Sequence, residues 1–542
     1  MKSADEALSR EVERGMTREH LLRRAAALGI VVAGGTFGPL TEAAFASTQI
    51  KRGGTFRIGI SGGAANDFID GQHIVNEPDI ARLVANYEGL AYFDENYKPK
   101  IDGLAEELRA EKANQWLIRV RDGVEFHNGK TLTADDVIYS IRRTISHPLK
   151  IFGQVGLSVI DSRRIKKLDK RTVRLFLKRP DVTLIDSFSQ YFQGIVPVGY
   201  PAKQLGSRSN SPLRYIGTGA FKIQSFTPGR QSVHVRNENY WRTGQPYFDR
   251  LVLIDFPDDA ARVNALLGGQ IDALVDLPAA QVSVINRRKN LKVYEVPQGG
   301  WTPITMAVDQ PPFTDVRVRQ AFRLLANRPQ MVRQGLGGHG RVANDIYSPF
   351  DSCYAGDEFP QRKYDPERAK SLLRAAGQEN ITIDCFTNPA DTGMVEGAEI
   401  FAQTARAGGV TVNVRNIPDF YGDQYLKYTF ATDFWSTRNY LQQVAVGSLK
   451  ESAFNETHWD KHPRYGRFLS LYRQALATVD EKKRCDIIRE MQRMEYNEGG
   501  HIVWAFKSAL DAHSKKVGGF KVDRGTLSLN KYGNNFRTIY FV

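Results

Sequence analysis

Hydrophobic and polar residues follow two alternating patterns along the chain. Polar and apolar side chains take turns in Gln115–Val120 and in residues 172–177, which is the period of a β-strand with one buried face. Residues 53–60 predict a further strand, bounded by glycines. Other segments repeat apolar residues every three or four positions, the period of a helix with one buried stripe. Strands and helices that alternate in this way predict an α/β protein.

The helices are predicted from their first residues as well as from their stripes. The first predicted helix spans Ala134–Ile145, and another has Pro366 at its first position and Gly377 at its end. We interpret the apolar stripes as core faces, not as cofactor sites. Because the chain has neither a repeat nor a low-complexity linker, we expect lobes that pack together. Four helices start after a residue that can cap them: Thr133, Asp315, Asp365 and Asp480.

The first 46 residues have the layout of an export signal. Arg23 and Arg24 precede a weakly apolar stretch over residues 25–40, and small residues flank Phe45 at a cleavage site that ends at Ala46. The stretch is too short and too rich in glycine to remain as a membrane span. The alternative interpretation is an amphipathic surface helix. We therefore expect a soluble, periplasmic mature protein that begins at residue 47.

The export route stays open between the general secretory and the twin-arginine pathways. Residues 17–23 resemble a twin-arginine signal, except that Glu19 stands where the second arginine belongs. The long polar segment before the apolar stretch also fits that route. No cysteine follows the apolar stretch, so a lipid anchor is not predicted.

The charge balance does not predict a nucleic-acid partner. The chain has 74 Lys and Arg against 60 Asp and Glu, a formal charge of +14. The basic residues are scattered, and no aromatic residues interleave them in a stripe. We interpret the charge as a solvated basic surface. Binding to nucleic acid would instead fall steeply with salt.

Three cysteines are present, Cys353, Cys385 and Cys485, too widely spaced for a CxxC metal motif. An odd number leaves at least one free thiol in an exported protein. Cys353 and Cys385 could pair, but the sequence gives no distance between them.

Three motifs with possible chemistry are each more simply explained by structure. Ser61 lies in a G-x-S-x-G motif after a strand, but a nucleophile normally follows several strands of its sheet. Gly129 and Lys130 end a sequence that misses the spacing of a phosphate-binding loop. His458 and His462 could share a helix face with a metal, yet no third and fourth ligands are identifiable. Neither a catalytic site, a metal site nor a cofactor is predicted.

Several segments occur in the order known from one family of proteins. The strongest match is VRDGVEFHNG at residues 120–129, followed by LTADDV at 132–137. The chain resembles the extracellular solute-binding proteins of family 5, which serve dipeptide, oligopeptide and nickel ABC importers. The resemblance covers about residues 51–520. The other matching segments are RGGTFRI at 52–58, NYEGL at 86–90, GTGAFK at 217–222, RNENYW at 236–241, ARVNALLGGQID at 261–272, PFTDVRVRQA at 312–321 and YDPERA at 364–369.

The resemblance implies a two-lobed periplasmic binding protein fold, type II-like and of cluster C. The first lobe would cover residues 47–297 and resume at 506–542, with an extra subdomain inserted at about 98–215. The second lobe would cover residues 298–505. Two crossings between the lobes make a hinge that supports closure around a ligand. The implied partners are a small ligand and the transmembrane subunits and ATPase of an ABC importer, and we expect a monomer.

The resemblance also points to the ligand-binding segment. Peptide-binding relatives offer an aspartate for the ligand amine after a tryptophan that corresponds to Trp435, but here Arg438 stands in that region. Arg438 could bind an anionic group, or it could form an ordinary salt bridge. Glu456 could supply the missing carboxylate, and aromatic rings could stack on the solute. The candidate ligand-binding residues are Trp435, Arg438, Asn439, Tyr440, Asn455, Glu456 and Trp459.

These observations predict a non-catalytic receptor that hands a peptide-like or amino-acid-derived solute to a membrane permease. Two alternatives stay open. One is a secreted serine hydrolase that uses Ser61, which would lose activity on Ser61→Ala. The other is a binding protein for a non-peptide solute such as an opine or a metal chelate.

Overall fold

The computed structural model describes residues 50–149, 151–201, 211–520, 524–525 and 536–542. The predicted export signal and its cleavage site at Ala46 lie outside the described residues. Lys51–Val542 forms one compact unit, and the fold below is that of this unit. None of the helices in the described part of the chain has the length and apolar character needed to cross a membrane.

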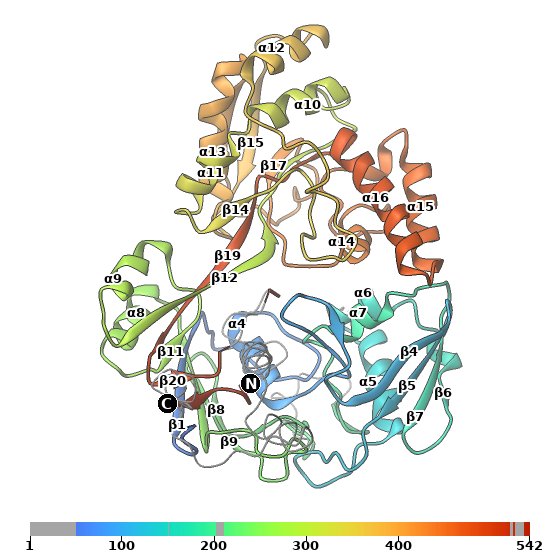
Figure 1. Ribbon diagram of the computed structural model, residues 1–542, viewed down its shortest axis with the longest axis vertical. Helices are drawn as coiled ribbons and strands as arrows, with labels where there is room; N and C mark the ends of the chain where they lie inside the picture. The colour runs from blue at the N-terminus through green and yellow to red at the C-terminus, as the bar shows by residue number, and fades with distance from the viewer. Residues whose placement is uncertain (1–49, 150, 202–210, 521–523, 526–535) are drawn as a thin grey trace, which may run out of the picture. The chain divides into compact units, whose positions relative to one another are not determined.

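The fold is the two-lobed α/β fold that the sequence predicted, and its largest sheet has eight strands (Figure 1). β1 (Thr55–Ser61) pairs in parallel with β10 (Arg250–Phe256) and β11 (Ala273–Leu274), while β12 (Leu291–Trp301) and β19 (Ala505–Ser514) pair antiparallel. Phe56, Ile58 and Ile60 of β1 are fully buried in the core. The strand order is β12 (Leu291–Trp301), β19 (Ala505–Ser514), β11 (Ala273–Leu274), β1 (Thr55–Ser61), β10 (Arg250–Phe256), β9 (Gln231–Arg236) and β8 (Phe221–Thr227), with β14 (Gly340–Val342) added beside β19.

A five-stranded sheet forms the core of the second lobe. The helix predicted after Asp315 is α10 (Val316–Leu325). Its apolar stripe is fully buried, which confirms that the stripe is a core face; it consists of Val318, Ala321, Phe322 and Leu325. The strand order of the sheet is β16 (Thr411–Asn416), β15 (Thr382–Thr387), β17 (Phe430–Thr432), β13 (Ile304–Met306) and β18 (His501–Ile502). The helices of this part are α10 (Val316–Leu325), α11 (Arg328–Gly335), α12 (Pro366–Ala375), α13 (Met394–Ala405), α14 (Tyr440–Gly447), α15 (Tyr465–Ala477) and α16 (Glu481–Glu498).

A separate four-stranded sheet lies within the predicted inserted segment. The predicted helix Ala134–Ile145 is confirmed as α5, and the Thr133 backbone N–H donates to the Asp136 carboxylate at 2.9 Å. The strand order is β4 (Ala105–Lys112), β5 (Gln115–Val120), β7 (Thr172–Phe176) and β6 (Lys166–Lys167). The other α-helices and strands of the described residues are α4 (Glu77–Asn86), α6 (Gly153–Leu157), α7 (Leu184–Phe188), α8 (Asp259–Leu267), α9 (Val282–Asn286), β2 (Tyr92–Phe93), β3 (Pro99–Lys100), β20 (Val517–Gly518) and β21 (Tyr540–Phe541).

β12 and β19 run side by side from the large sheet toward the five-stranded sheet (Figure 1). Their register is regular from Leu291 to Pro297 and shifts before Trp301. The predicted lobe limits at residues 297/298 and 505/506 fall in β12 and at the start of β19. These limits stay a prediction, as does the extent of the inserted subdomain.

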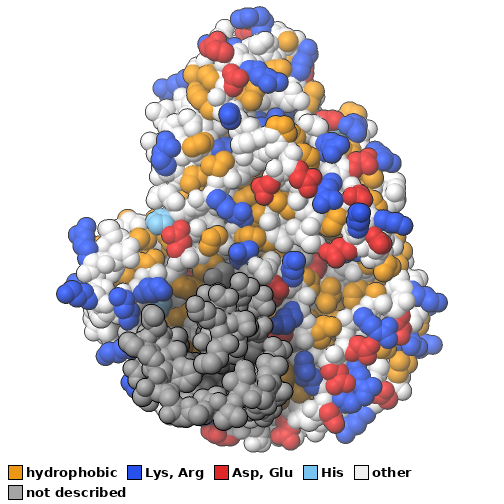
Figure 2. All heavy atoms as spheres, in the orientation of Figure 1, with side chains coloured by type: hydrophobic (Ala, Val, Ile, Leu, Met, Phe, Trp, Pro, Cys, Tyr) orange, Lys and Arg blue, Asp and Glu red, His pale blue; other side chains and the backbone are white. Residues whose placement is uncertain are grey.

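Lysine and arginine side chains are spread among aspartate and glutamate on the face drawn in Figure 2. This mixture agrees with the interpretation of the positive charge as a solvated surface.

The cysteine pairing differs from the one considered from the sequence. Cys353 forms a disulfide with Cys485 in α16, and Cys385 in β15 is a buried free thiol. A pairing of Cys353 with Cys385 is therefore wrong. The reason is that Cys385 packs in the core of the five-stranded sheet, whereas Cys353 packs with the aromatic side chains around α14 to α16.

The disulfide predicts a redox-dependent stability. It closes a loop with a sequence separation of 132 residues, so reduction restores much chain entropy to the unfolded state. We expect a reductant to lower the free energy of unfolding by roughly 2–5 kcal/mol, measured as a fall in melting temperature. Cys385→Ala should retain this fall, and the Cys353→Ala, Cys485→Ala double variant should lose it. Equal sensitivity in all three proteins would contradict the prediction.

Candidate ligand-binding site

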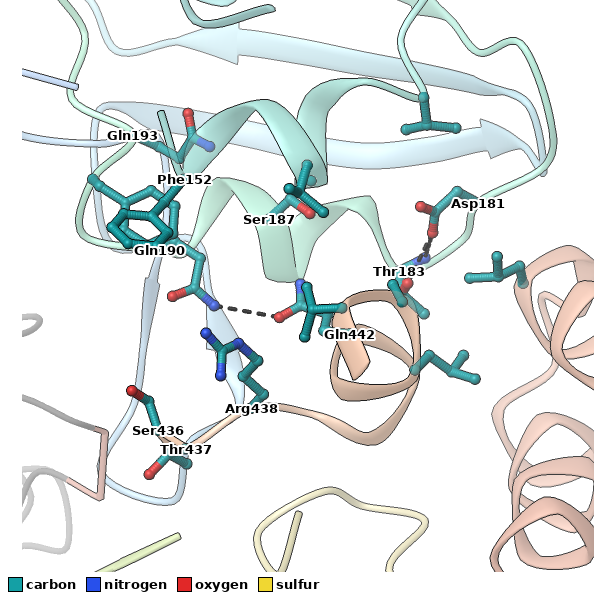
Figure 3. Close-up of a pocket in the computed structure, with 18 of the residues that line it drawn as sticks. Phe152, Asp181, Thr183, Ser187, Gln190, Gln193, Ser436, Thr437, Arg438 and Gln442 are labelled. Carbon is teal, nitrogen blue, oxygen red and sulfur yellow. Dashed lines mark hydrogen bonds between the residues drawn. The ribbon is translucent and has the colours of Figure 1, made fainter. Parts of the chain in front are cut away.

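A cavity of about 1080 Å³, including the part open to solvent, lies between α6 and α7 on one side and α14 and α15 on the other (Figure 3). We call it the main pocket. Helix α14 and the three residues Ser436, Thr437 and Arg438 before it form one wall. The loop after α7, with Gln190 and Phe192, contributes to the opposite wall. The pocket is thus built from segments about 250 residues apart in the chain.

Hydrogen bonds join the two sides of the main pocket. The Gln190 side-chain amide donates to Gln442 Oε1 at 3.3 Å (Figure 3). Close by, the Val182 backbone N–H donates to the Leu476 carbonyl at 2.9 Å. The Tyr97 hydroxyl adds a third bond, to the Thr437 carbonyl at 2.8 Å. These contacts hold the two walls together around the pocket.

Arg438 is the cationic group of the α14 wall. Its side chain is half-buried, and Figure 3 shows its guanidinium pointing toward Gln190 and Gln442. The guanidinium carbon lies 5.4 Å from the centre of the Trp435 ring, a cation–π distance. A planar guanidinium flanked by amides can bind a carboxylate through two parallel hydrogen bonds.

Trp435 anchors the segment that carries Arg438. Its backbone exchanges two hydrogen bonds with Trp301, at 2.9 and 2.8 Å, and the two rings stack with centroids 6.1 Å apart. Its indole N–H donates to Glu456 Oε1 at 2.9 Å. Trp435 is only 6% exposed. The buried Trp435 side chain therefore fixes the position of the segment that carries Arg438.

Glu456 belongs to a buried network of carboxyl groups. Its Oε1 also hydrogen-bonds His501 Nε2 at 2.9 Å, and its side chain hydrogen-bonds Asp433. Asp433 in turn accepts hydrogen bonds from the hydroxyls of Tyr421 and Tyr425, at 3.2 and 2.8 Å. Burial raises the pKa of Glu456 to about 7, and burial with the neighbouring Glu456 raises that of Asp433 well above its usual value.

The other predicted ligand-binding residues also have internal partners. Tyr440 is fully buried, and its hydroxyl donates to Glu495 Oε2 at 2.5 Å. The Asn455 amide donates to Asp460 at 2.6 Å, and Trp459 stacks on His462. Asn439 lines a second cavity beside the main pocket. Of the seven, Arg438 lines the main pocket, and direct ligand contact by the other six stays a prediction.

The motifs set aside in the sequence have structural roles. His458 hydrogen-bonds Asp309 at 2.6 Å and the Leu426 carbonyl at 2.7 Å. Lys130 forms an ion pair with Asp136. Ser61 ends β1, and within the described ranges no hydrogen bond joins it to a histidine. No group of three or more histidine, cysteine, aspartate or glutamate side chains is placed to hold a metal ion among the described residues.

Most of the main pocket was missed in the sequence. Phe152, Val155, Gln190, Phe192 and Gln442 line it, yet no motif marks them. This wall becomes visible only in the structure, where Phe152 is 55% and Val155 49% exposed, in α6 and the residue before it.

Comparisons with known proteins give one consistent family. The model of the bacterial extracellular solute-binding proteins, family 5 Middle, matches residues 101–445. The dipeptide-binding protein of Escherichia coli (strain K12) is 26% identical over 475 residues, which are 82% of this chain and 88% of that protein.

Two solved structures show the same fold. AgaA from A. tumefacien R10, in complex with agropinic acid, has a TM-score of 0.72 and 22% identity, over 90% of this chain and 99% of that chain. A putative peptide-binding protein AppA from Clostridium difficile has a TM-score of 0.79 and 17% identity, over 90% of this chain and 100% of that chain.

The carboxyl network predicts a stability that falls as pH rises. Because the folded pKa of Glu456 is raised from 4.5 to about 7, the folded state keeps a proton that the unfolded chain releases in this window. We expect the free energy of unfolding to fall by up to about 3 kcal/mol across it. In Glu456→Gln the amide can keep the hydrogen bonds, so denaturant unfolding at several pH values should show a flatter dependence. The control is Glu451→Gln, an exposed site that should keep the wild-type slope. An unchanged slope in Glu456→Gln would contradict the assignment.

Proposed function

Because the chain belongs to family 5 of the bacterial extracellular solute-binding proteins, we propose that it captures an amino-acid-derived solute with a free carboxylate for an ABC importer. The solute is held in the main pocket, between the two lobes, and is delivered in the periplasm to the membrane permease. The chain acts as a receptor, since the proteins of this family bind solutes. In this proposal the lobes cover residues 47–297 with 506–542, and 298–505.

Arg438 is the observation that carries this proposal. A half-buried guanidinium in a pocket between lobes is a strong site for a carboxylate, because water no longer screens the pair fully. The amides of Gln190 and Gln442 lie beside it and can bind further polar atoms of the solute (Figure 3).

The apolar part of the main pocket supports a solute with a side chain. Phe152 and Val155 are about half exposed on one wall, and Leu441 and Val446 face the pocket from the other. A ligand that covers such side chains gains about 25 cal/mol for each Å² of apolar surface removed from water. Convergent polar groups in a mostly apolar cleft are typical of a small-molecule site.

The bonds between the pocket walls support capture by closure. Gln190, Val182 and Tyr97 each hydrogen-bond a residue on the α14–α15 side. β12 and β19 connect the two sheets and can act as the hinge. The relatives agree with a carboxylate-bearing solute, since one is named a dipeptide-binding protein and another was solved with agropinic acid.

The ligand class is tested by solutes retained on the purified protein. Mass spectrometry after gentle denaturation should detect a small organic acid that contains nitrogen, and adding that compound back should raise the melting temperature. Recovery of inorganic ions alone would contradict an amino-acid-derived ligand.

The role of Arg438 predicts the effect of its substitution. Hydrogen bonds to a charged group are worth about 1.5–3 kcal/mol, so Arg438→Ala should weaken binding of a carboxylate solute about 10- to 150-fold in calorimetry. Arg438→Lys keeps the charge but not the two-pronged geometry and should lie between. Arg467→Ala, on the outer surface of α15, is the control. If Arg438→Ala binds the carboxylate solute with wild-type affinity, the proposal is wrong.

A further inference from the structure

A second cavity of about 840 Å³, including its solvent-open part, adjoins the main pocket. Thr183 and Leu441 line both cavities, so the two spaces meet at the first turn of α14. Arg438 lines the main pocket, and the next residue, Asn439, lines the second. A solute that extends past this turn would contact both.

Two aspartates line the second cavity, and we therefore call it the acidic cavity. Asp186 in α7 and Asp351 in the facing loop line it. Asp186 is only 7% exposed, and its carboxylate accepts a hydrogen bond from the Asn439 side chain. No ion pair involves Asp186 or Asp351 in the part of the chain that the structure describes. Asp351 is held by two backbone N–H groups, of Cys353 at 2.7 Å and Tyr440 at 2.8 Å.

Two cations, Arg484 and Lys98, also line the acidic cavity, but neither forms an ion pair with Asp186 or Asp351 among the described residues. The Arg484 guanidinium donates to the carbonyls of Thr478 and Val479, at 3.0 and 3.1 Å, after the end of α15. Its charge lowers the pKa of both Asp186 and Asp351, but burial outweighs this effect and raises the pKa of each. The Lys98 side chain lines the cavity from an exposed position. Glu481, also exposed, accepts a hydrogen bond from the Ser352 hydroxyl at 2.8 Å.

A buried carboxylate without a cation is costly, and proteins normally pair such a group. Here burial, together with the charge of Asp351, raises the pKa of Asp186 to about 7. The cavity beside Asp186 leaves room for a partner that comes from outside the chain.

We infer that the acidic cavity binds an ammonium group of the solute, with Asp186 as its direct partner and Asp351 as a second negative charge. This inference rests on the proposed function, in which Arg438 holds the carboxylate of the same solute. The site then selects zwitterions that span the first turn of α14, with the carboxylate in the main pocket and the ammonium group in the acidic cavity. In this inference Asp186 of α7 binds the amine of the solute. It takes the role of the aspartate that is absent from the segment after Trp435.

Calorimetry with paired probes tests the inference. Glycyl-leucine and alanyl-phenylalanine are each offered with a free amine, N-acetylated, and as the C-terminal amide. Wild type should bind the free-amine form at least tenfold more tightly than the acetylated form. Asp186→Asn should reduce this ratio to near one and leave binding of the acetylated form unchanged. Asp135→Asn, an exposed carboxylate on α5, should keep the wild-type ratio.

The outcomes separate the two proposals. Equal binding of free and acetylated probes by wild type, with the amide bound more weakly, overturns the ammonium site and keeps the carboxylate site. An unchanged ratio in Asp186→Asn overturns the role of Asp186. Binding of none of the probes overturns both proposals. If Asp186→Asn does not fold, Asp351→Asn replaces it and should lower the ratio by a smaller factor, because Asp351 supplies the second negative charge of the cavity.

Discussion

The paired backbones of Trp301 and Trp435 are the constraint on which the binding region depends. Trp301 is the last residue of β12, a strand that starts in the eight-stranded sheet. Its two hydrogen bonds to Trp435 tie the segment that carries Arg438 directly to this strand. The indole of Trp435 is held in turn by Glu456, so neither the ring nor the backbone can shift without breaking a buried hydrogen bond. The segment that carries Arg438 is thereby held in place as firmly as a strand of the sheet.

This anchoring explains how one short segment can present opposite chemistry to two cavities. Arg438 and Asn439 are neighbours in sequence, but they line different cavities on either side of the start of α14. Asn439 orients the Asp186 carboxylate, while Arg438 faces the amides of Gln190 and Gln442. In our proposal, a positive and a negative site are held at a fixed separation by one helix turn, so they favour zwitterions whose charges have that separation; two independent loops would hold the separation less firmly.

Local signals in the sequence were enough to predict the helices, the strands and the family. Helix caps, apolar stripes and family motifs each depend on residues that are close together in the chain. Asp365 accepts a hydrogen bond from the Arg368 N–H at 2.9 Å, as its position before Pro366 predicted. The Cys353–Cys485 disulfide and the acidic cavity depend instead on distances between segments far apart in the chain. Glu456 shows the same limit. Its identity as a carboxylate near the site was predicted, but its partners come from the loop after β17 and from β18.

Glu456 and Asp186 show why burial alone does not identify a ligand-binding carboxylate. Burial is the largest cause that raises the pKa of each, to about 7 in both cases. The hydrogen bonds of Glu456 are supplied from within, by Trp435, His501 and Asp433. Asp186 has Asn439 as the one hydrogen-bond partner of its carboxylate among the described residues, and it faces a cavity. A buried carboxylate can therefore have either of two roles, and its hydrogen-bond partners decide between them. Glu456 fixes the loop that carries Trp435, whereas we propose that Asp186 binds a cation.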